Sequence, residues 1–427
     1  MAQASNKFRV VRVVAQCGTF KMPAICGQTC APGLTFATGG SLQRAPKEHG
    51  IHRFWGLSSA LPNPAASIER IAGHQGDGLR LQSRLSLVAL AAAGMATAKR
   101  VKRQHVKQGR VSPAPPVPGS IPRPWEVGPG QKTSPVEGFP DHKYSIFRTD
   151  DTSIEIKSAD DIQRMRAAGA LAREALQVGG RAVAPGVTTR EVDEAVHNFV
   201  VSRGAYPSPL GYLGYPRATC TSVNDVMFHG YPDDRPLEAS DIVNLDVTVY
   251  LDGFHGDTSS MFFAGRPRKS AYLLCEVAER ARDAGIAVCG PGVDFREIGK
   301  AIQGVADEAN YDNFPMAHGH GIGSYFHGRP QVEHVRSTKD VGLMRPGMTF
   351  TIEPVLIEQK NAEWEMLGDD PWIVRARSAA WSAQFEHTIL ITDTGHQVLT
   401  GPSVDYKALA KESLQAVANS GDEGPAK

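Results

Sequence analysis

The chain is poor in cysteine and contains no long apolar run. Its six cysteines among 427 residues include no C-x-x-C pair, so neither a zinc knuckle nor a thioredoxin-like redox motif is present. A disulfide framework is not expected at this density, which favours a reducing compartment. No apolar stretch reaches the roughly 18 residues of a membrane-spanning helix. The 41% hydrophobic and 21% charged content is typical of a globular protein with one large core or two ordinary ones.

Acidic residues are scarce in the first quarter of the chain. Residues 1–110 contain 16 Lys and Arg against 3 Asp and Glu, whereas the remainder contains 30 against 42. A basic, acid-poor arm is typical of an organelle-targeting segment. The alternative is a disordered tail that binds nucleic acid, but the basic residues are scattered singly instead of clustered. Within the arm, the apolar stretch Leu85–Ala98 is either a second sorting signal or an Ala-rich helix.

The chain is predicted to have four parts. Residues 1–110 form the basic extension, and residues 111–150 form a linker strap rich in proline and glycine. The catalytic domain is expected at residues 151–415, with a disordered tail at residues 416–427. Within the domain, Asp160–Val178 has the spacing of an amphipathic helix, and Thr188 with Glu191 predicts the capping box of a second helix.

An internal repeat indicates a duplicated half-domain. PGVTTREVDEAV at Pro185–Val196 recurs as PGVDFREIGKAI at Pro291–Ile302, at an offset of 106 residues. Pro-Gly-Val, Arg-Glu and the apolar phase all match. Helix starts often resemble one another, so a chance match is the alternative, but the pattern favours two related lobes.

Two aspartates are predicted to share one face of a hairpin. Strand-forming residues in Asp241–Ala264 alternate on both sides of Asp252-Gly253, which is a strong hairpin signal. A turn centred there places Thr248 opposite Asp257, so Asp246 becomes a diagonal neighbour of Asp257. The opposite face is expected to lie in a core and carries Val243, Leu245, Val247, Val249 and Leu251.

Two further acids lie inside apolar, strand-like runs. These are Glu353 in MTFTIEPVLI and Glu386 in QFEHTILIT, and burying either is costly unless it is paired or binds a cation. A glycine-flanked histidine pattern, MAHGHGIGSYFHGRP, occupies Met316–Pro330. Four carboxylates with an imidazole favour Mn, Fe, Co or Zn. Their combined charge favours two divalent ions, a typical apparatus of hydrolysis.

At this point the sequence resembles the type I methionine aminopeptidases, which have the α+β pita-bread fold of metallopeptidases. The resemblance spans about Pro113 to Leu399. It rests on five motifs: HGYPDD, DIVNLDVTVYLDGFHGDTSSMF, HGIGSYFHGRP, MTFTIEP and FEHTILIT. It implies two pseudo-symmetric lobes with a central antiparallel sheet flanked by helices. It also implies five metal ligands, namely Asp246, Asp257, His320, Glu353 and Glu386.

The resemblance further implies roles for individual residues. Asp257 and Glu386 would bridge the two ions, and Glu353 would also move the proton of the attacking water. His229 would lie near the substrate amine, and His327 would donate to the carbonyl oxygen. The glycines at 319, 321 and 323 are expected to let the backbone come close to the ions. A methionine pocket would be lined by Tyr212, Tyr215, Cys220, Phe326 and Trp372.

The implied activity is removal of the initiator methionine from nascent chains with a small second residue. The expected partners are nascent N-termini, met at the ribosome among other places, and neither nucleic acid nor a transmembrane anchor is expected. The protein is expected to be a monomer in a plastid or a mitochondrion. The alternatives are an X-Pro aminopeptidase or prolidase of the same fold, or a binding module that has lost its metal. Three positions depart from the family pattern, namely Pro209, Phe228 and His318.

Overall fold

Two helices begin where the sequence predicts capping residues. The computed structural model describes residues 103–125, 154–367, 370 and 372–420, all within one compact unit. Helix α2 (Ala159–Ala182) starts after Ser158, whose hydroxyl forms a capping box with Asp161. Helix α3 (Thr189–Ser202) starts after Thr188, which forms the predicted capping box with Glu191. The first helix ends four residues later than its apolar spacing indicates, because Gly179 and Gly180 continue it as buried residues.

The described residues form three more α-helices. They are α4 (Lys269–Ala287), α5 (Arg296–Glu308) and α6 (Tyr406–Ser420), and a short 3₁₀ turn, η1, spans Tyr212–Gly214. Among the described residues no helix is long and apolar enough to cross a membrane. The predicted extension up to residue 102, the strap segment 126–150 and the tail 421–427 lie outside the described residues. Cys17, Cys26 and Cys30 lie there too, and the other three cysteines are free and buried.

All the strand pairs are antiparallel, as the resemblance implies. The largest sheet has nine strands in the order β1-β4-β5-β14-β9-β7-β8, with β15 on β14 and β2 on β4. Two small sheets have the orders β13-β10-β6 and β11-β12-β3. The strands of the first half are β1 (Tyr206–Pro207), β2 (Cys220–Val223), β3 (Val226–Phe228), β4 (Ile242–Leu251), β5 (Phe254–Phe263), β6 (Asp312–Asn313) and β7 (His318–Gly321). The later strands are β8 (Gly328–Glu333), β9 (Thr349–Ile352), β10 (Val355–Ile357), β11 (Trp364–Met366), β12 (Val374–Ala376), β13 (Ser382–Gln384), β14 (Glu386–Ile391) and β15 (His396–Val398).

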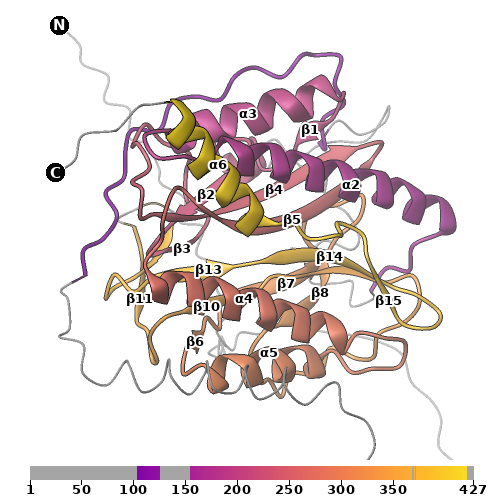
Figure 1. Ribbon diagram of the computed structural model, residues 1–427. Coiled ribbons are helices and arrows are strands. Elements are labelled where there is room, and N and C mark those ends of the chain that lie inside the picture. Colours follow the sequence, from indigo (N-terminus) through magenta and orange to yellow (C-terminus); the bar gives the residue numbers. More distant parts are fainter. Residues whose placement is uncertain (1–102, 126–153, 368–369, 371, 421–427) are drawn as a thin grey trace, which may run out of the picture. The chain divides into compact units, whose positions relative to one another are not determined.

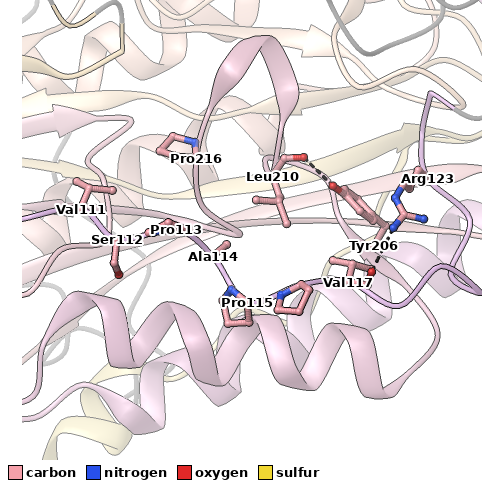
Figure 2. A pocket seen from close by; sticks show the side chains of 11 residues that line it. Val111, Ser112, Pro113, Ala114, Pro115, Val117, Arg123, Tyr206, Leu210 and Pro216 are labelled. Atoms are coloured by element: carbon pink, nitrogen blue, oxygen red, sulfur yellow. Dashed lines mark hydrogen bonds between the residues drawn. The ribbon is translucent and has the colours of Figure 1, made fainter.

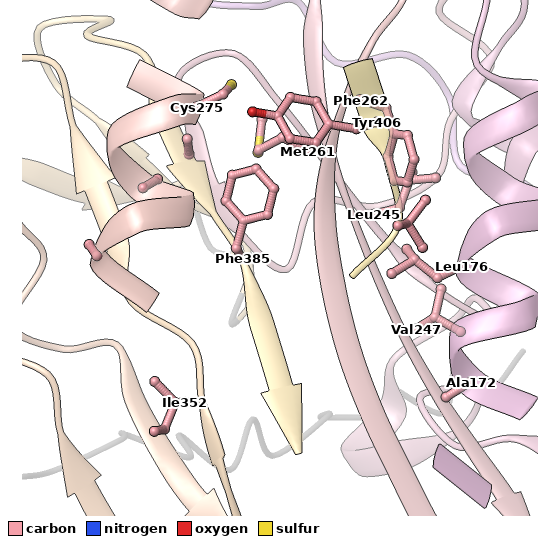
Figure 3. Packing of buried hydrophobic residues seen from close by; sticks show 14 of the residues in the cluster. Ala172, Leu176, Leu245, Val247, Met261, Phe262, Cys275, Ile352, Phe385 and Tyr406 are labelled. Carbon is pink, nitrogen blue, oxygen red and sulfur yellow. The ribbon is translucent and has the colours of Figure 1, made fainter. Parts of the chain in front are cut away.

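Helices α2, α3 and α6 pack against the part of the large sheet that contains β4 and β5, whereas α4 packs mainly on β13 and β10 and α5 on β8 and β6 (Figure 1). Helix α2 packs on β4 and β5, and Figure 3 shows Leu176 of α2 beside Leu245 and Val247 of β4. The side chains of Val243, Leu245, Val247 and Val249 are buried in this core, as predicted. Because neighbouring residues of a strand point to opposite faces, Asp246 and Thr248 lie on the face of the sheet turned away from the helices.

The internal repeat of the sequence is a repeat of structure. Gly186 and Gly292, 106 residues apart, both have positive φ, 83° and 80°. The amide of Gly186 donates to the carbonyl of Leu237, and the amide of Gly292 donates to that of Met344. Each segment then leads into the second helix of a packed pair, α2 with α3 and α4 with α5. The prediction of two related lobes is therefore confirmed.

Part of the strap is bound to the catalytic unit by a buried arginine. Arg217 is completely buried and its guanidinium donates to the carbonyls of Ser112 and Pro113, both at 2.9 Å. The same side chain pairs with the buried carboxylate of Asp193 at 2.6 Å. Just before the strap, at the end of the basic extension, Val106 and Gly109 donate backbone N–H groups to the side chains of Asp225 and Asp233. The strap thus satisfies polar groups that would otherwise be buried without partners.

Arg217→Met is expected to lower the free energy of unfolding by about 3–5 kcal/mol, because it leaves Asp193 buried and unpaired. Urea denaturation measures the change. Arg164→Met is a matched control, since Arg164 and Asp160 form an exposed pair worth at most about 1 kcal/mol. If the two variants are equally stable, the buried pair is not a major tether.

Candidate metal centre

The hairpin places its two aspartates as the sequence predicts. Strands β4 and β5 pair with Thr248 opposite Asp257, and Asp246 is opposite Ser259. Thr248 donates its hydroxyl to Asp257 Oδ1 at 2.7 Å. Asp246 and Asp257 are therefore diagonal neighbours on one face, and their carboxyl groups are close enough to form a hydrogen bond when one is protonated.

The remaining three predicted ligands arrive from β14, β7 and the end of β9. Strand β14 lies between β5 and β9 in the sheet, so Glu386, which is opposite Ser259, borders both lobes. Ligand atoms of Asp257, His320 and Glu386 lie within 4.8 Å of one another. His320 Nε2 is 3.6 Å from Asp257 Oδ2 and 3.5 Å from Glu353 Oε1. The fold thus brings all five predicted side chains together.

The cluster is electrostatically unfavourable without a cation. Burial, with the neighbouring carboxylates Asp257 and Glu353, raises the pKa values of Asp246 and Glu386 well above their usual range. Burial also raises the pKa of Glu353 to about 7, although His320 opposes the shift. Burial alone would lower the pKa of His320, but Asp257 and Glu353 outweigh it and raise that pKa. Four neighbouring acidic side chains thus have only one positively charged partner within the cluster, the His320 imidazolium.

The donor set fits a divalent metal. Glu386 Oε1 is a buried oxygen with no hydrogen-bond partner among the described residues, and an unpaired buried carboxylate oxygen is costly. The chemistry of four carboxylates and one imidazole suits Mn, Fe, Co or Zn and does not select among them. No cysteine sulfur belongs to this group of ligands, which disfavours a site built for a soft, thiolate-bound metal.

Three residues that support the cluster were not predicted. Thr351 accepts from the amide of His320 at 2.9 Å and donates to Glu353 Oε1 at 2.8 Å. Gln384 donates to the Glu353 carbonyl at 3.2 Å, and His334 Nε2 accepts from the Glu353 amide at 3.2 Å. Thr351 and Gln384 each precede a predicted ligand by two positions, so strand alternation could have identified them.

The predicted pocket residues form a cluster of rings beside the cluster of acids. The ring of Tyr212 lies 4.9 Å from that of Phe326 and 6.5 Å from that of Trp372. The ring of Tyr215 is 5.4 Å from Trp372 in an edge-on arrangement. Cys220 is buried and pairs with Asp246 across β2 and β4. The five predicted pocket residues therefore form one cluster, in which aromatic rings and a sulfur atom lie next to the carboxylates.

His327 and His229 lie beside this cluster of rings, and both side chains are neutral imidazoles. Burial lowers the pKa of His229 to about 4, and burial with three neighbouring histidines lowers that of His327 well below its usual range. The ring of His327 is 4.2 Å from that of His320 and is stacked on Tyr212. Tyr212 Oη lies 2.9 Å from His327 Nδ1. When this hydroxyl donates to Nδ1, the ring proton is on Nε2, which makes Nε2 a donor.

A fourth unpredicted residue, His255, packs against the cluster of rings. His255 is completely buried, and its ring stacks on Phe326 at 5.3 Å with an interplanar angle of 10°. Its Nδ1 lies 2.9 Å from the hydroxyl of Ser208. His255 precedes Asp257 by two positions, so the alternation that places the aspartate also points toward this histidine. Its stacking partner lies on a distant loop, and that contact had no signal in the sequence.

The glycines near His320 leave room for protein atoms. A side chain at Gly319 or Gly321 would meet the carbonyl of Thr351 or of Arg329 on neighbouring strands. A side chain at Gly323 would meet Lys157, whose buried ammonium pairs with Glu155 and donates to Tyr325 Oη at 3.1 Å. From the sequence, the backbone at these glycines is expected to come close to the ions. At Gly319 and Gly321 it comes close to neighbouring strands instead. The loop after β7 also supplies the bend that separates His320 from His327.

One cavity lies at the strap, apart from the predicted ligands. It measures about 480 Å³ and is lined by strap residues such as Val111 and Pro115 together with Tyr206, Leu210 and Pro216 (Figure 2). Tyr206 donates its hydroxyl to the carbonyl of Leu210, and Arg123 donates to that of Val117. None of the predicted site residues lines it, so it is separate from the metal centre.

Comparison with known proteins assigns the family. Residues 163–393 match the model of Metallopeptidase family M24. Methionine aminopeptidase 1D, chloroplastic/mitochondrial, of Arabidopsis thaliana is 46% identical over 70% of this chain and 80% of its own length. Human methionine aminopeptidase 1D, mitochondrial, is 47% identical over 58% and 73%.

Solved structures agree with the sequence relatives. The crystal structure of methionine aminopeptidase from Rickettsia prowazekii is 40% identical with a TM-score of 0.57, and the match covers 58% of this chain and all of that one. The crystal structure of methionine aminopeptidase from Thermotoga maritima is 29% identical with a TM-score of 0.56, and the match covers 58% of this chain and all of that one. The chain belongs to Metallopeptidase family M24, in its methionine aminopeptidase branch.

Proposed function

We propose that the protein is a metal-dependent aminopeptidase that removes the N-terminal methionine from nascent proteins with a small second residue. The observation that carries the proposal is a cluster of four carboxylates and one histidine directly beside a cluster of aromatic rings and a buried cysteine. The relatives named methionine aminopeptidases, at 41–47% identity, support the same activity. The unbranched, polarizable thioether of a methionine side chain suits an environment of aromatic rings.

The proposed metal ligands are the five clustered side chains. Asp257 and Glu386 would be shared by two ions, Asp246 would contribute to one of them, and His320 and Glu353 would contribute to the other. When bound, divalent ions lower the pKa of a coordinated water and polarise a carbonyl group. Two ions are favoured over one because four carboxylates exceed the charge of a single divalent ion. The identity of the ions is open among Co, Mn, Fe and Zn, since the same ligands suit all four.

Proton transfer is assigned to Glu353. Its Oε1 lies 3.5 Å from His320 Nε2 within the cluster, so the carboxylate is beside the position where an attacking water would be held, and a carboxylate there can serve as a general base and acid. Thr351 and Gln384 hold the carboxylate through hydrogen bonds at 2.8 Å and 3.4 Å. Glu353 therefore takes the proton from the attacking water and passes it to the leaving amine.

His327 and His229 bind the reacting peptide group. The Nε2–H of His327, fixed by Tyr212 at Nδ1, donates to the carbonyl oxygen as charge develops on it. The ring of His229 lies 5.4 Å from that of Trp372, and His229 is assigned to the substrate amine. Phe228 packs edge-on against His229 at 4.6 Å.

The expected location is an organelle that translates its own proteins. The prediction from the basic arm agrees with four relatives that are named chloroplastic, mitochondrial or both. The organellar location is thus confirmed. The names of these relatives include both plastid and mitochondrion, so they do not choose between the two. Contact with the ribosome and a monomeric state remain predictions, as do the four predicted parts of the chain.

A substrate comparison tests the proposed function. The full chain, stripped of metal and then restored with Mn²⁺, is expected to release methionine from Met-Gly-Met and to leave an Ala-Pro peptide intact. Release only from the Ala-Pro peptide would establish the X-Pro alternative. Equal release by the stripped protein would show that the activity does not need the metal.

A further inference from the structure

His318 extends the active-site face of β7 by one polar side chain. It precedes His320 by two positions, so both side chains lie on the same face of the strand. On β8 the partners are Glu333 opposite His318 and Gln331 opposite His320. These four side chains form a polar row that begins at a proposed metal ligand and leads away from it.

The row leads outward from the metal centre toward solvent. The side chain of His320 is 9% exposed and that of His318 is 19% exposed, while Met316 beyond them is 40% exposed. A strand advances about 3.3 Å per residue, so His318 lies roughly 7 Å from His320 along β7. An extended peptide covers the same distance in about two residues. A substrate cleaved beside His320 could therefore place its third residue near His318.

The ring of His318 is held in place by charged neighbours. Its Nε2 lies 3.1 Å from Glu333 Oε2, and a carboxylate at that distance accepts the Nε2 proton. Lys339 in turn donates to Glu333 Oε1 at 3.3 Å and to Gln331 Oε1 at 3.0 Å. No described residue bonds Nδ1 of His318, so this nitrogen is available to a ligand.

We propose that His318, fixed by Glu333 and Lys339, forms a subsite that hydrogen-bonds the backbone of the substrate's third residue. A peptide N–H is the matching group, because Nδ1 of the neutral ring is an acceptor. The subsite recognises the backbone and therefore tolerates different third side chains. The inference rests on the proposed function, since it assigns further substrate contacts to the same site.

Substrate length tests the subsite. The metal-restored full chain is assayed on Met-Gly-Met-Met and on methionine p-nitroanilide, which has no peptide bond beyond the scissile one. His318→Ala is expected to lower the ratio of the two kcat/KM values about three- to tenfold, as for one lost hydrogen bond, mainly through KM of the tetrapeptide. An equal loss on both substrates, or none on either, would overturn the proposal.

Two conservative variants distinguish the roles of the two ring nitrogens of His318. His318→Asn retains a polar atom near the position of Nδ1 and is expected to keep the ratio within about twofold of wild type. His318→Gln retains one near Nε2 instead, so its ratio should fall as in the alanine variant. If Gln rescues the ratio and Asn does not, the hydrogen bond between Nε2 and Glu333 matters only for structure and the subsite does not exist.

The controls distinguish this proposal from the proposed function. Lys300→Ala, at an exposed position of α5, should keep the wild-type ratio. Wild-type protein that releases methionine from neither substrate would defeat the proposed function itself. Wild-type protein active on both, with a ratio unaffected by His318→Ala, would defeat the subsite alone.

Discussion

Asp257→Asn is expected to lower kcat/KM for Met-Gly-Met by about 10³-fold or more. The variant keeps the shape of the side chain but removes a negative charge at the centre of the cluster, where Asp257 lies 3.6 Å from His320. Electrostatic groups that act directly on the reacting atoms typically contribute about 10²–10³-fold each, and this carboxylate also holds the ions. Activity equal to wild type would exclude the two-ion mechanism.

The same variant has an opposite effect on the metal-free protein. Burial and the charge of Asp257 together raise the pKa values of Asp246 and Glu386, so removal of that charge relieves repulsion. Metal-free Asp257→Asn should unfold at a higher temperature than metal-free wild type. Added Mn²⁺ should raise the Tm of wild type and have little effect on the variant, because only a bound ligand stabilises the folded state. A lower Tm for the metal-free variant would contradict the electrostatic account.

Glu353→Gln is expected to lower kcat by about 10²–10⁴-fold, the usual contribution of a general acid–base group. The amide still fits beside Thr351 and Gln384 but cannot carry a proton between water and amine. KM should change much less than kcat, since the methionine pocket is untouched. Steady-state kinetics on Met-Gly-Met measures both constants.

A matched control for Glu353→Gln is available on the surface. Glu308→Gln makes the same chemical change at an exposed residue of α5 that pairs with Arg280 at 3.8 Å, and it should leave both constants at wild-type values. A kcat for Glu353→Gln within tenfold of wild type would assign proton transfer to another group.

The sequence predicts most accurately where signals are local. The turn at Asp252-Gly253 determines the register of β4 and β5, and the structure shows Thr248 opposite Asp257 as the spacing requires. The capping box of Thr188 is confirmed for the same reason, because its partner lies three residues away. The repeat at an offset of 106 residues is longer in range, but it is made of two local patterns that are alike.

Contacts between distant strands are less accessible to sequence reasoning. The alternation of β14 shows that Glu386 shares a face with other residues, but it does not reveal that β14 lies between β5 and β9. The stacking of His255 on Phe326 and the bond from the Glu353 amide to His334 depend on that arrangement. His318 had no predicted role for the same reason, since its partner Glu333 lies across the ladder on β8.

Metal stoichiometry tests the central claim most directly. The full chain is stripped of metal, titrated with Mn²⁺ and examined by native mass spectrometry beside Asp257→Asn. If the five clustered side chains hold a metal pair, wild type should gain the mass of two ions per chain and the variant should lose at least one of them. A wild-type protein that binds no ion, or a variant that binds two as tightly as wild type, would contradict the assignment.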